Sequence, residues 1–477
     1  MKRIIFLLSV VSIVGISGCK LGPKYQRSQF NLAEKYRFDS VAADTNVNLR
    51  WWEMFKDSTL NSLINKALRA NKDVMIAASR VEAARATVGY NKADNYPTIN
   101  IAAGASRGNF SGAKLNSINN NFYAYPELAW ELDFWGKYRS ATDAARAELL
   151  ASQYGMRATQ ISLISNVIST YFQLLEYESK LDISRNTLVS RKQGLKILEQ
   201  RYAHGMVAEI DVNQSQIQWA LAASAVPSYE RQIATTQSTL SILLGELPKA
   251  ITTGILLLDQ PMPPDVPTGI PSRLLERRPD IQEAEQYARA ANEQIGVSIA
   301  QRFPSISLTG LLGVASNDLS TLTSGGLVWS ASGSLLGPVF QFGKNKRRVE
   351  IAKYQALEAN LTYESTVLQA FREVEDALVS IETLKRELDV LQVRYQAAIN
   401  AEKLSWQRYD KGVTSYLEVI DSQTQSFEAQ LDYSETRQEL LTTYIQLYNA
   451  LGGGWLSPEE EQSTIDSQSN NNQQITK

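Results

Sequence analysis

The chain has 477 residues, of which 44% are hydrophobic, and its formal net charge is only −2. Because Lys and Arg are not in excess, the chain lacks the electrostatic footprint of a nucleic-acid-binding protein. No nucleic-acid partner is therefore expected. The single cysteine, Cys19, excludes an intramolecular disulfide.

The N-terminus has the pattern of an export signal. Lys2 and Arg3 precede an apolar run over 4–16, and small residues stand before Cys19. This order predicts a signal peptide over 1–18. The letters ISGC resemble a bacterial lipobox, so we predict that Cys19 is acylated and begins a lipid-anchored, extended segment over 19–55. Lys20 stands where an inner-membrane retention signal would place Asp, which favours sorting to the outer membrane.

Two nearly identical stretches indicate an internal repeat. RYAHGMVAEIDVNQSQ begins at Arg201 and RYDKGVTSYLEVIDSQ begins at Arg408, roughly 207 residues later, and equal spacing without a net insertion indicates two copies of one unit. The same offset relates Pro97 to Pro304, Gly136 to Gly343 and Leu244 to Leu451. The predicted organisation is a first repeat over 56–250, a linker over 251–271, a second repeat over 272–456 and a disordered polar tail over 457–477.

Each repeat contains a pair of runs in which apolar and polar residues alternate, as expected for strands. Each run approximates the 9–11 residues that a tilted strand needs to cross a bilayer. An ordinary hairpin packed on a soluble core is the alternative. The four predicted strands cover 98–110, 121–135, 304–314 and 329–340.

Long helices are predicted over 137–202 and 344–409, where no proline interrupts roughly 65 residues. At 1.5 Å per residue, each would extend about 100 Å. Their apolar positions form two rows, which suits a helix with a neighbour on each side and favours a ring of helices around water. Gly205 and Gly412 would let each helix turn back.

Four strands cannot form an open sheet in lipid, because unpaired edge groups would each cost several kcal/mol. The strands therefore predict an oligomer. A dimer, trimer or tetramer would supply 8, 12 or 16 strands, and an 8-stranded barrel is nearly filled by its own side chains.

Several motifs resemble one family. The resemblance rests on the motifs CKLGPKYQR over 19–27, LLERRPDI over 274–281, FWGK, FGKN and the paired RYxxG turns. They are similar to the TolC-like outer-membrane factors of tripartite RND-type efflux systems, in the lipidated OprM-like branch. The resemblance implies a mainly α protein with a transmembrane β section: a homotrimer whose 12-stranded outer-membrane barrel continues into a long periplasmic α-helical barrel.

The same resemblance implies two sites at the periplasmic mouth. A periplasmic adaptor, also called a membrane fusion protein, would contact the turns, while a hydrophobic and an acidic ring would narrow the resting mouth at Leu417 and Asp421. The first repeat has Ile210 and Gln214 at the equivalent positions, so only one acidic ring is expected. The alternatives are a packing leucine, a solvated carboxylate and turns that only reverse the helices. The predicted adaptor contacts are Gly205, Met206, Val207, Gly412, Val413 and Thr414.

No motif supports catalysis, a cofactor or a metal site. His204 is the sole histidine, too isolated for a His-cluster metal site or a His-dependent triad. Arg277-Arg278-Pro279-Asp280 is interpreted as a structural helix start.

The predicted function is a passive exit duct in the outer membrane. It would carry drugs or toxic compounds received from an inner-membrane RND-type transporter and the adaptor, with outer-membrane lipid as its surroundings. The same duct serving protein secretion or metal-ion export is one alternative. A lipid-anchored periplasmic coiled-coil scaffold without a pore is another.

Overall fold

The computed structural model of the chain describes residues 20–31, 36–37, 51–108, 118–264, 271–324 and 326–453. Cys19, the predicted signal peptide and the predicted tail lie outside these residues. The elements in chain order are η1 Trp51–Phe55, α2 Ser58–Ala70, α3 Lys72–Ala93, β1 Thr98–Gly108, β2 Asn119–Leu132, α4 Lys137–Ala203, α5 Glu209–Leu243, η2 Leu257–Asp259, α6 Pro271–Arg277, α7 Pro279–Ala300, β3 Ser305–Ser316, η3 Leu319–Thr321, β4 Leu327–Leu336, α8 Lys344–Asp410 and α9 Tyr416–Ala450.

The repeat seen in the sequence is a repeat of structure. Helices α4 and α8 have 67 residues each, and α5 and α9 have 35 residues each. Both long helices begin directly after a glycine with positive φ, Gly136 at 76° and Gly343 at 82°. The prediction of two long helices with shorter returning helices is therefore confirmed.

The chain forms two compact units, which do not coincide with the two repeats. The strand unit comprises Met1–Gln29, Ser79–Tyr154 and Glu283–Ser365. The helical unit comprises Phe30–Ala78, Gly155–Gln282 and Thr366–Lys477. Each unit contains corresponding parts of both repeats, because β2 of the first repeat pairs with β3 of the second.

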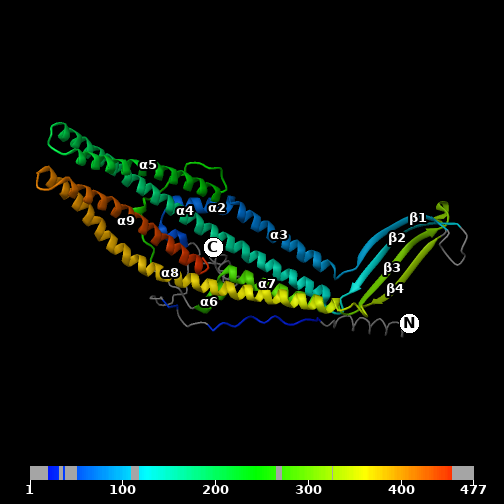
Figure 1. The fold of residues 1–477 in the computed structure, drawn as a ribbon. Helices are drawn as coiled ribbons and strands as arrows, with labels where there is room; N and C mark the ends of the chain where they lie inside the picture. The colour runs from blue at the N-terminus through cyan, green and yellow to red at the C-terminus, as the bar shows by residue number, and fades with distance from the viewer. Residues whose placement is uncertain are drawn as a thin grey trace, which may run out of the picture. The chain divides into compact units, whose positions relative to one another are not determined.

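The four strands form one antiparallel sheet in the order β1-β2-β3-β4, so β1 and β4 are its edges (Figure 1). Two predicted strand ends were too long. Strand β4 ends at Leu336 rather than near 340, because Gly337-Pro338 follows and proline cannot donate a ladder hydrogen bond. Strand β2 ends at Leu132 because Asp133 instead accepts the amides of Tyr138 and Arg139 at the start of α4.

The helical unit has an aromatic and aliphatic core around the short helix α2. Phe55 and Phe172 are fully buried, with ring centroids 4.9 Å apart in an edge-to-face arrangement. Asp57 caps α2 by accepting the amides of Thr59 and Leu60, and it also accepts the Tyr171 hydroxyl at 2.7 Å. These contacts fix α2 against α4.

The LLERRPDI motif has the structural role that the sequence predicted. Pro279 begins α7, and Asp280 accepts the Ile281 amide at 2.9 Å. Arg278 is 7% exposed, and its guanidinium pairs with Asp280 and Glu373 and donates to the Ala450 carbonyl. Arg278 therefore ties the start of α7 to α8 and α9.

None of the helices within the described residues combines the length and the apolarity that a membrane crossing requires.

Candidate functional site

The two glycine turns have the same backbone structure. Gly205 has φ of 70° and donates its amide to the Tyr202 carbonyl at 2.8 Å, while the next amide donates to Arg201 at 2.9 Å. Gly412, with φ of 69°, makes the corresponding bonds, and its successor donates to Arg408 at 2.9 Å. This pair of bonds is the Schellman motif, which satisfies the last carbonyls of a helix and needs a residue that tolerates positive φ. A side chain at either glycine would meet only open space.

The residues that follow the two glycines differ in exposure. Met206 and Val413 are 68% and 64% exposed, respectively. Val207 is partly buried against a small cluster that includes Leu198 and Tyr416, and the Thr414 hydroxyl donates to the Glu418 carboxylate. The turns thus present Met206 and Val413 to solvent, while Val207 and Thr414 also hold the turns in shape.

The two turns lie side by side at one end of the helical unit (Figure 1). A small core joins them, made of Leu198 on α4, Tyr409 on α8, and Tyr416 and Val419 on α9; we call these four residues the tip core. On the surface beside it, Arg201 pairs with Asp410, with 3.0 Å between Nη2 and Oδ1. The equivalent Arg408 pairs with Glu418 on its own hairpin instead.

The two predicted gate residues share an outward face of α9. Tyr416 and Val419 are buried in the tip core, whereas Leu417 is 62% exposed and Asp421 is exposed. Asp421 Oδ2 accepts a hydrogen bond from Gln425 Nε2 at 2.7 Å. Leu417 and Asp421 are thus adjacent on a surface that one chain leaves free.

Arg191 was not singled out by sequence reasoning. It is 3% exposed, donates to the carbonyl of Gln218 on α5 and to that of Gln423 on α9, and lies over the Phe427 ring. Burial lowers the pKa of this guanidinium, and the charge of Glu402 opposes the shift only in part. Arg191 therefore links the two helical hairpins from inside. No local pattern marks it, since its partners lie on other helices.

In the strand unit, the register places apolar and polar residues on opposite faces of the sheet, which confirms the predicted alternation. The polar face is interrupted by Leu311, Val328 and Leu336. It carries Asn100, Tyr123, Tyr125, Glu127, Glu131, Ser305, Ser307, Thr309, Ser330, Ser332 and Ser334. The apolar face carries Ile99, Ile101, Phe122, Leu128, Trp130, Leu132, Ile306, Leu308, Leu312, Val314, Leu327, Trp329 and Leu335.

The sequence profile described as outer membrane efflux protein matches residues 63–246 and 270–453, more than half of the chain. The chain belongs to this family. Two curated members illustrate the breadth of the family. The solvent efflux pump outer membrane protein SrpC of Pseudomonas putida is 33% identical over 468 residues, which are 94% of this chain and 98% of SrpC. The cation efflux system protein CusC of Escherichia coli is 33% identical over 466 residues, 94% of this chain and 98% of CusC.

A solved family structure has the same fold. The CmeC outer membrane channel of Campylobacter jejuni superposes with a TM-score of 0.87 at 26% identity, covering 95% of this chain and 99% of CmeC. The chain is therefore an outer membrane efflux protein, a channel protein rather than an enzyme, located in the outer membrane with a large periplasmic helical part.

Proposed function

We propose that three copies of this chain form the passive exit duct of a tripartite efflux pump. The observation that carries the proposal is the four-stranded sheet with one apolar face and two unpaired edges. In hydrocarbon the edge amides and carbonyls of β1 and β4 require partners, and neighbouring copies can supply them.

The oligomer number follows from the space inside the barrel. Two copies would supply eight strands, whose side chains nearly fill the interior, whereas three would supply twelve and leave a conduit. Cyclic symmetry makes every β1-to-β4 contact equivalent. The apolar face then meets lipid, and the serine- and tyrosine-bearing face lines the duct.

The N-terminus anchors this duct in the proposal. Removal of residues 1–18 makes Cys19 the first residue, and its acylation adds about 0.8 kcal/mol for each buried CH₂. The proposed chain organisation keeps the boundaries stated for the linker 251–271 and for the repeats 56–250 and 272–456. The tail over 457–477 has no role in it.

The periplasmic mouth is proposed to lie at the two turns. Leu417 and Asp421, repeated three times around an axis, would form an apolar ring and an acidic ring that narrow the mouth. The three Asp421 carboxylates would also repel one another and create a local field that attracts cations. A periplasmic adaptor would dock on the turns through Met206 and Val413, with Gly205, Val207, Gly412 and Thr414 setting their shape. The adaptor would connect the duct to an inner-membrane RND-type transporter, which supplies the energy.

The transported compounds are proposed to be small toxic molecules such as drugs or solvents. Relatives equally identical to this chain act in solvent efflux and in cation efflux by name, so the duct itself does not determine the cargo. Metal-ion export is the second candidate for that reason. Within the described residues no group of three or more His, Cys, Asp or Glu side chains is placed to hold a metal ion, and this favours a duct that conducts cargo without binding it.

The first experiment is to extract the mature protein from outer membranes, measure its detergent-corrected mass by light scattering and image the same particles by electron microscopy. The expected result is a trimer with a helical tube that projects from the micelle. A monomer or dimer of solid rods would contradict the proposal and support a periplasmic scaffold without a pore.

A further inference from the structure

A basic pocket lies in the strand unit where helix α3 ends and helix α4 begins. Its volume is about 310 Å³, the lower end of the size usual for small-molecule sites. Four basic side chains line it, together with one carboxylate, that of Asp143. The bases are Lys20, Lys92, Arg139 and Arg146.

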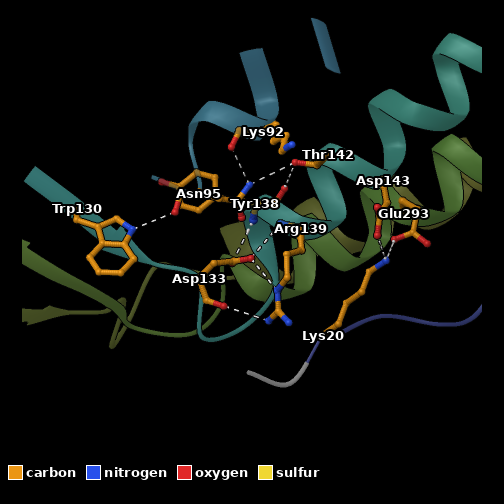
Figure 2. Close-up of polar contacts among 10 residues, drawn as sticks. All are labelled: Lys20, Lys92, Asn95, Trp130, Asp133, Tyr138, Arg139, Thr142, Asp143 and Glu293. Atoms are coloured by element: carbon orange, nitrogen blue, oxygen red, sulfur yellow. Dashed lines mark hydrogen bonds and ion pairs between the residues drawn. The ribbon is translucent and has the colours of Figure 1, made fainter. Parts of the chain in front are cut away.

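The charges in this pocket are only partly balanced. Lys20 Nζ lies 2.8 Å from Asp143 and 2.7 Å from Glu293, and Arg146 shares Asp143 at 2.9 Å. Arg139 pairs with Asp133 at 3.1 Å (Figure 2). The Lys92 side chain is exposed, and its ammonium makes no hydrogen bond or ion pair with any residue that the structure describes. The lining thus retains an excess of positive charge and has a free ammonium at its rim.

Two residues that line the pocket, Asn95 and Tyr96, connect it to the apolar face of the sheet. Trp130, on that face, donates its indole N–H to the Asn95 carbonyl at 3.1 Å (Figure 2). Tyr96 is 59% exposed and stands just before β1. Trp and Tyr gather where hydrocarbon gives way to headgroups. The pocket therefore lies at the level where the phosphates of a bilayer are found.

We propose that this pocket binds the phosphodiester headgroup of an anionic phospholipid in the periplasmic leaflet of the outer membrane. Lys92 and Arg146 would contact the phosphate, and Asn95 lies in the same wall of the pocket. The acyl chains would then follow the exposed side chains of Ile99 and Leu128 along the sheet. The inference rests on the proposed function, since it requires that this sheet faces lipid.

A basic pocket beside an apolar surface selects a lipid over a free anion for a physical reason. A phosphate ion gains only the charge contacts, which salt weakens. A phospholipid gains the same contacts and also buries its chains, as basic pockets beside membrane-spanning segments do for anionic lipids elsewhere. The apolar face continues without a break from Trp130 to Leu128 and Ile99.

The test uses purified full-length trimers in nanodiscs of phosphatidylcholine with and without phosphatidylglycerol, with bound lipid counted by native mass spectrometry. The double variant Lys92→Gln, Arg146→Gln should reduce phosphatidylglycerol retention about tenfold. Lys72→Gln is the matched control, an exposed lysine at the other end of α3, and should bind like the parent protein. If the double variant assembles poorly, Lys92→Gln alone is measured instead, and it should give an intermediate loss of phosphatidylglycerol retention.

Three outcomes would overturn the inference. Equal retention by the parent protein and the double variant would exclude these bases. Equal retention of phosphatidylcholine and phosphatidylglycerol would exclude selection for an anionic headgroup. Displacement of the lipid by millimolar inorganic phosphate would identify a free-anion site instead. Trimers of the double variant should conduct normally. A parent trimer that conducts but shows no preference for phosphatidylglycerol refutes the lipid site alone, whereas absence of parent trimers refutes the proposed function.

Discussion

Arg201 of the first RYxxG turn pairs with Asp410, the residue beside the second turn, with 3.0 Å between Nη2 and Oδ1. The equivalent Arg408 turns toward Glu418 on its own hairpin. The repeat therefore duplicates the motif without duplicating its contacts, because residue 203, which corresponds to Asp410, is an alanine. One arginine joins the two hairpins, and the other braces a single turn.

The Arg201 ion pair should contribute little to stability compared with the tip core. Its side chains are 30% and 57% exposed, and exposed pairs are worth about 0–1 kcal/mol. Tyr416 is 3% exposed, so Tyr416→Ala should cost about 3–5 kcal/mol. Heat-modifiable migration of detergent-solubilised protein measures both, with Arg201→Gln expected near the parent Tm. Equal decreases in Tm for the two variants would show that the surface ion pair stabilises the turns as much as the tip core does.

The gate proposal predicts that Leu417→Ala combined with Asp421→Ala raises ion conductance in planar bilayers on the order of twofold, since an apolar and a charged constriction are both removed. Cation selectivity should fall as well, because the acidic ring is lost. The repeat offers a matched control, Ile210→Ala combined with Gln214→Ala, which should leave selectivity unchanged. Unchanged permeability with normal trimer levels would remove the gate assignment.

The adaptor proposal predicts that Met206→Asp and Val413→Asp weaken co-purification of the adaptor about tenfold or more, the size expected from losing apolar contact area. Because both side chains are mostly exposed, the Tm of the channel should not change. Leu247→Asp, at an 86% exposed position after α5, is the control. Normal adaptor binding by both turn variants would place the contact elsewhere.

The sequence predicted the elements well where the signal was local or repeated. Proline before the strands, glycine before the long helices and alternation within the strands each determine structure within a few residues, so β1 and the start of α4 were correct. The end of β2 was not, since Asp133 can cap a helix only once that helix is in place. The contacts of Arg191 and the ion-pair partner of Arg201 could not be predicted from the sequence, because both involve residues that are distant in sequence.

The turn glycines offer a test that separates backbone strain from steric conflict. Gly205→Ala places a side chain at φ of 70° in open space and should cost about 1–2 kcal/mol. Gly205→Asn should cost less, because asparagine tolerates this conformation. Gly245→Ala should cost more than Gly205→Ala, since its φ is 72° and its new methyl would also meet the Ala70 carbonyl. Thermal unfolding in detergent ranks the three, and a Gly205→Ala variant with the lowest Tm would contradict this order.

Glu178 should make the stability of the helical unit depend on pH. Burial raises the pKa of this carboxyl above its ordinary 4.5, and the hydrogen bond from the Thr253 hydroxyl opposes the shift only in part. A raised pKa means that the folded state holds the proton more tightly than the unfolded state. Its contribution to stability is therefore complete below the unfolded pKa and is lost as pH rises through the folded pKa.

Glu178→Gln should remove that loss, because an amide keeps an acceptor for Thr253 without ionising. The Tm of this variant should nearly equal the parent Tm near pH 4, where the Glu178 carboxyl is mostly protonated in both the folded and the unfolded protein. It should exceed the parent Tm at about pH 7. Glu199→Gln, at an exposed site on α4, is the control and should shift Tm little. The measurement is thermal unfolding of solubilised protein over this pH range. A Glu178→Gln protein less stable than the parent at every pH would mean that the ionised carboxylate makes a favourable contact that outweighs its burial.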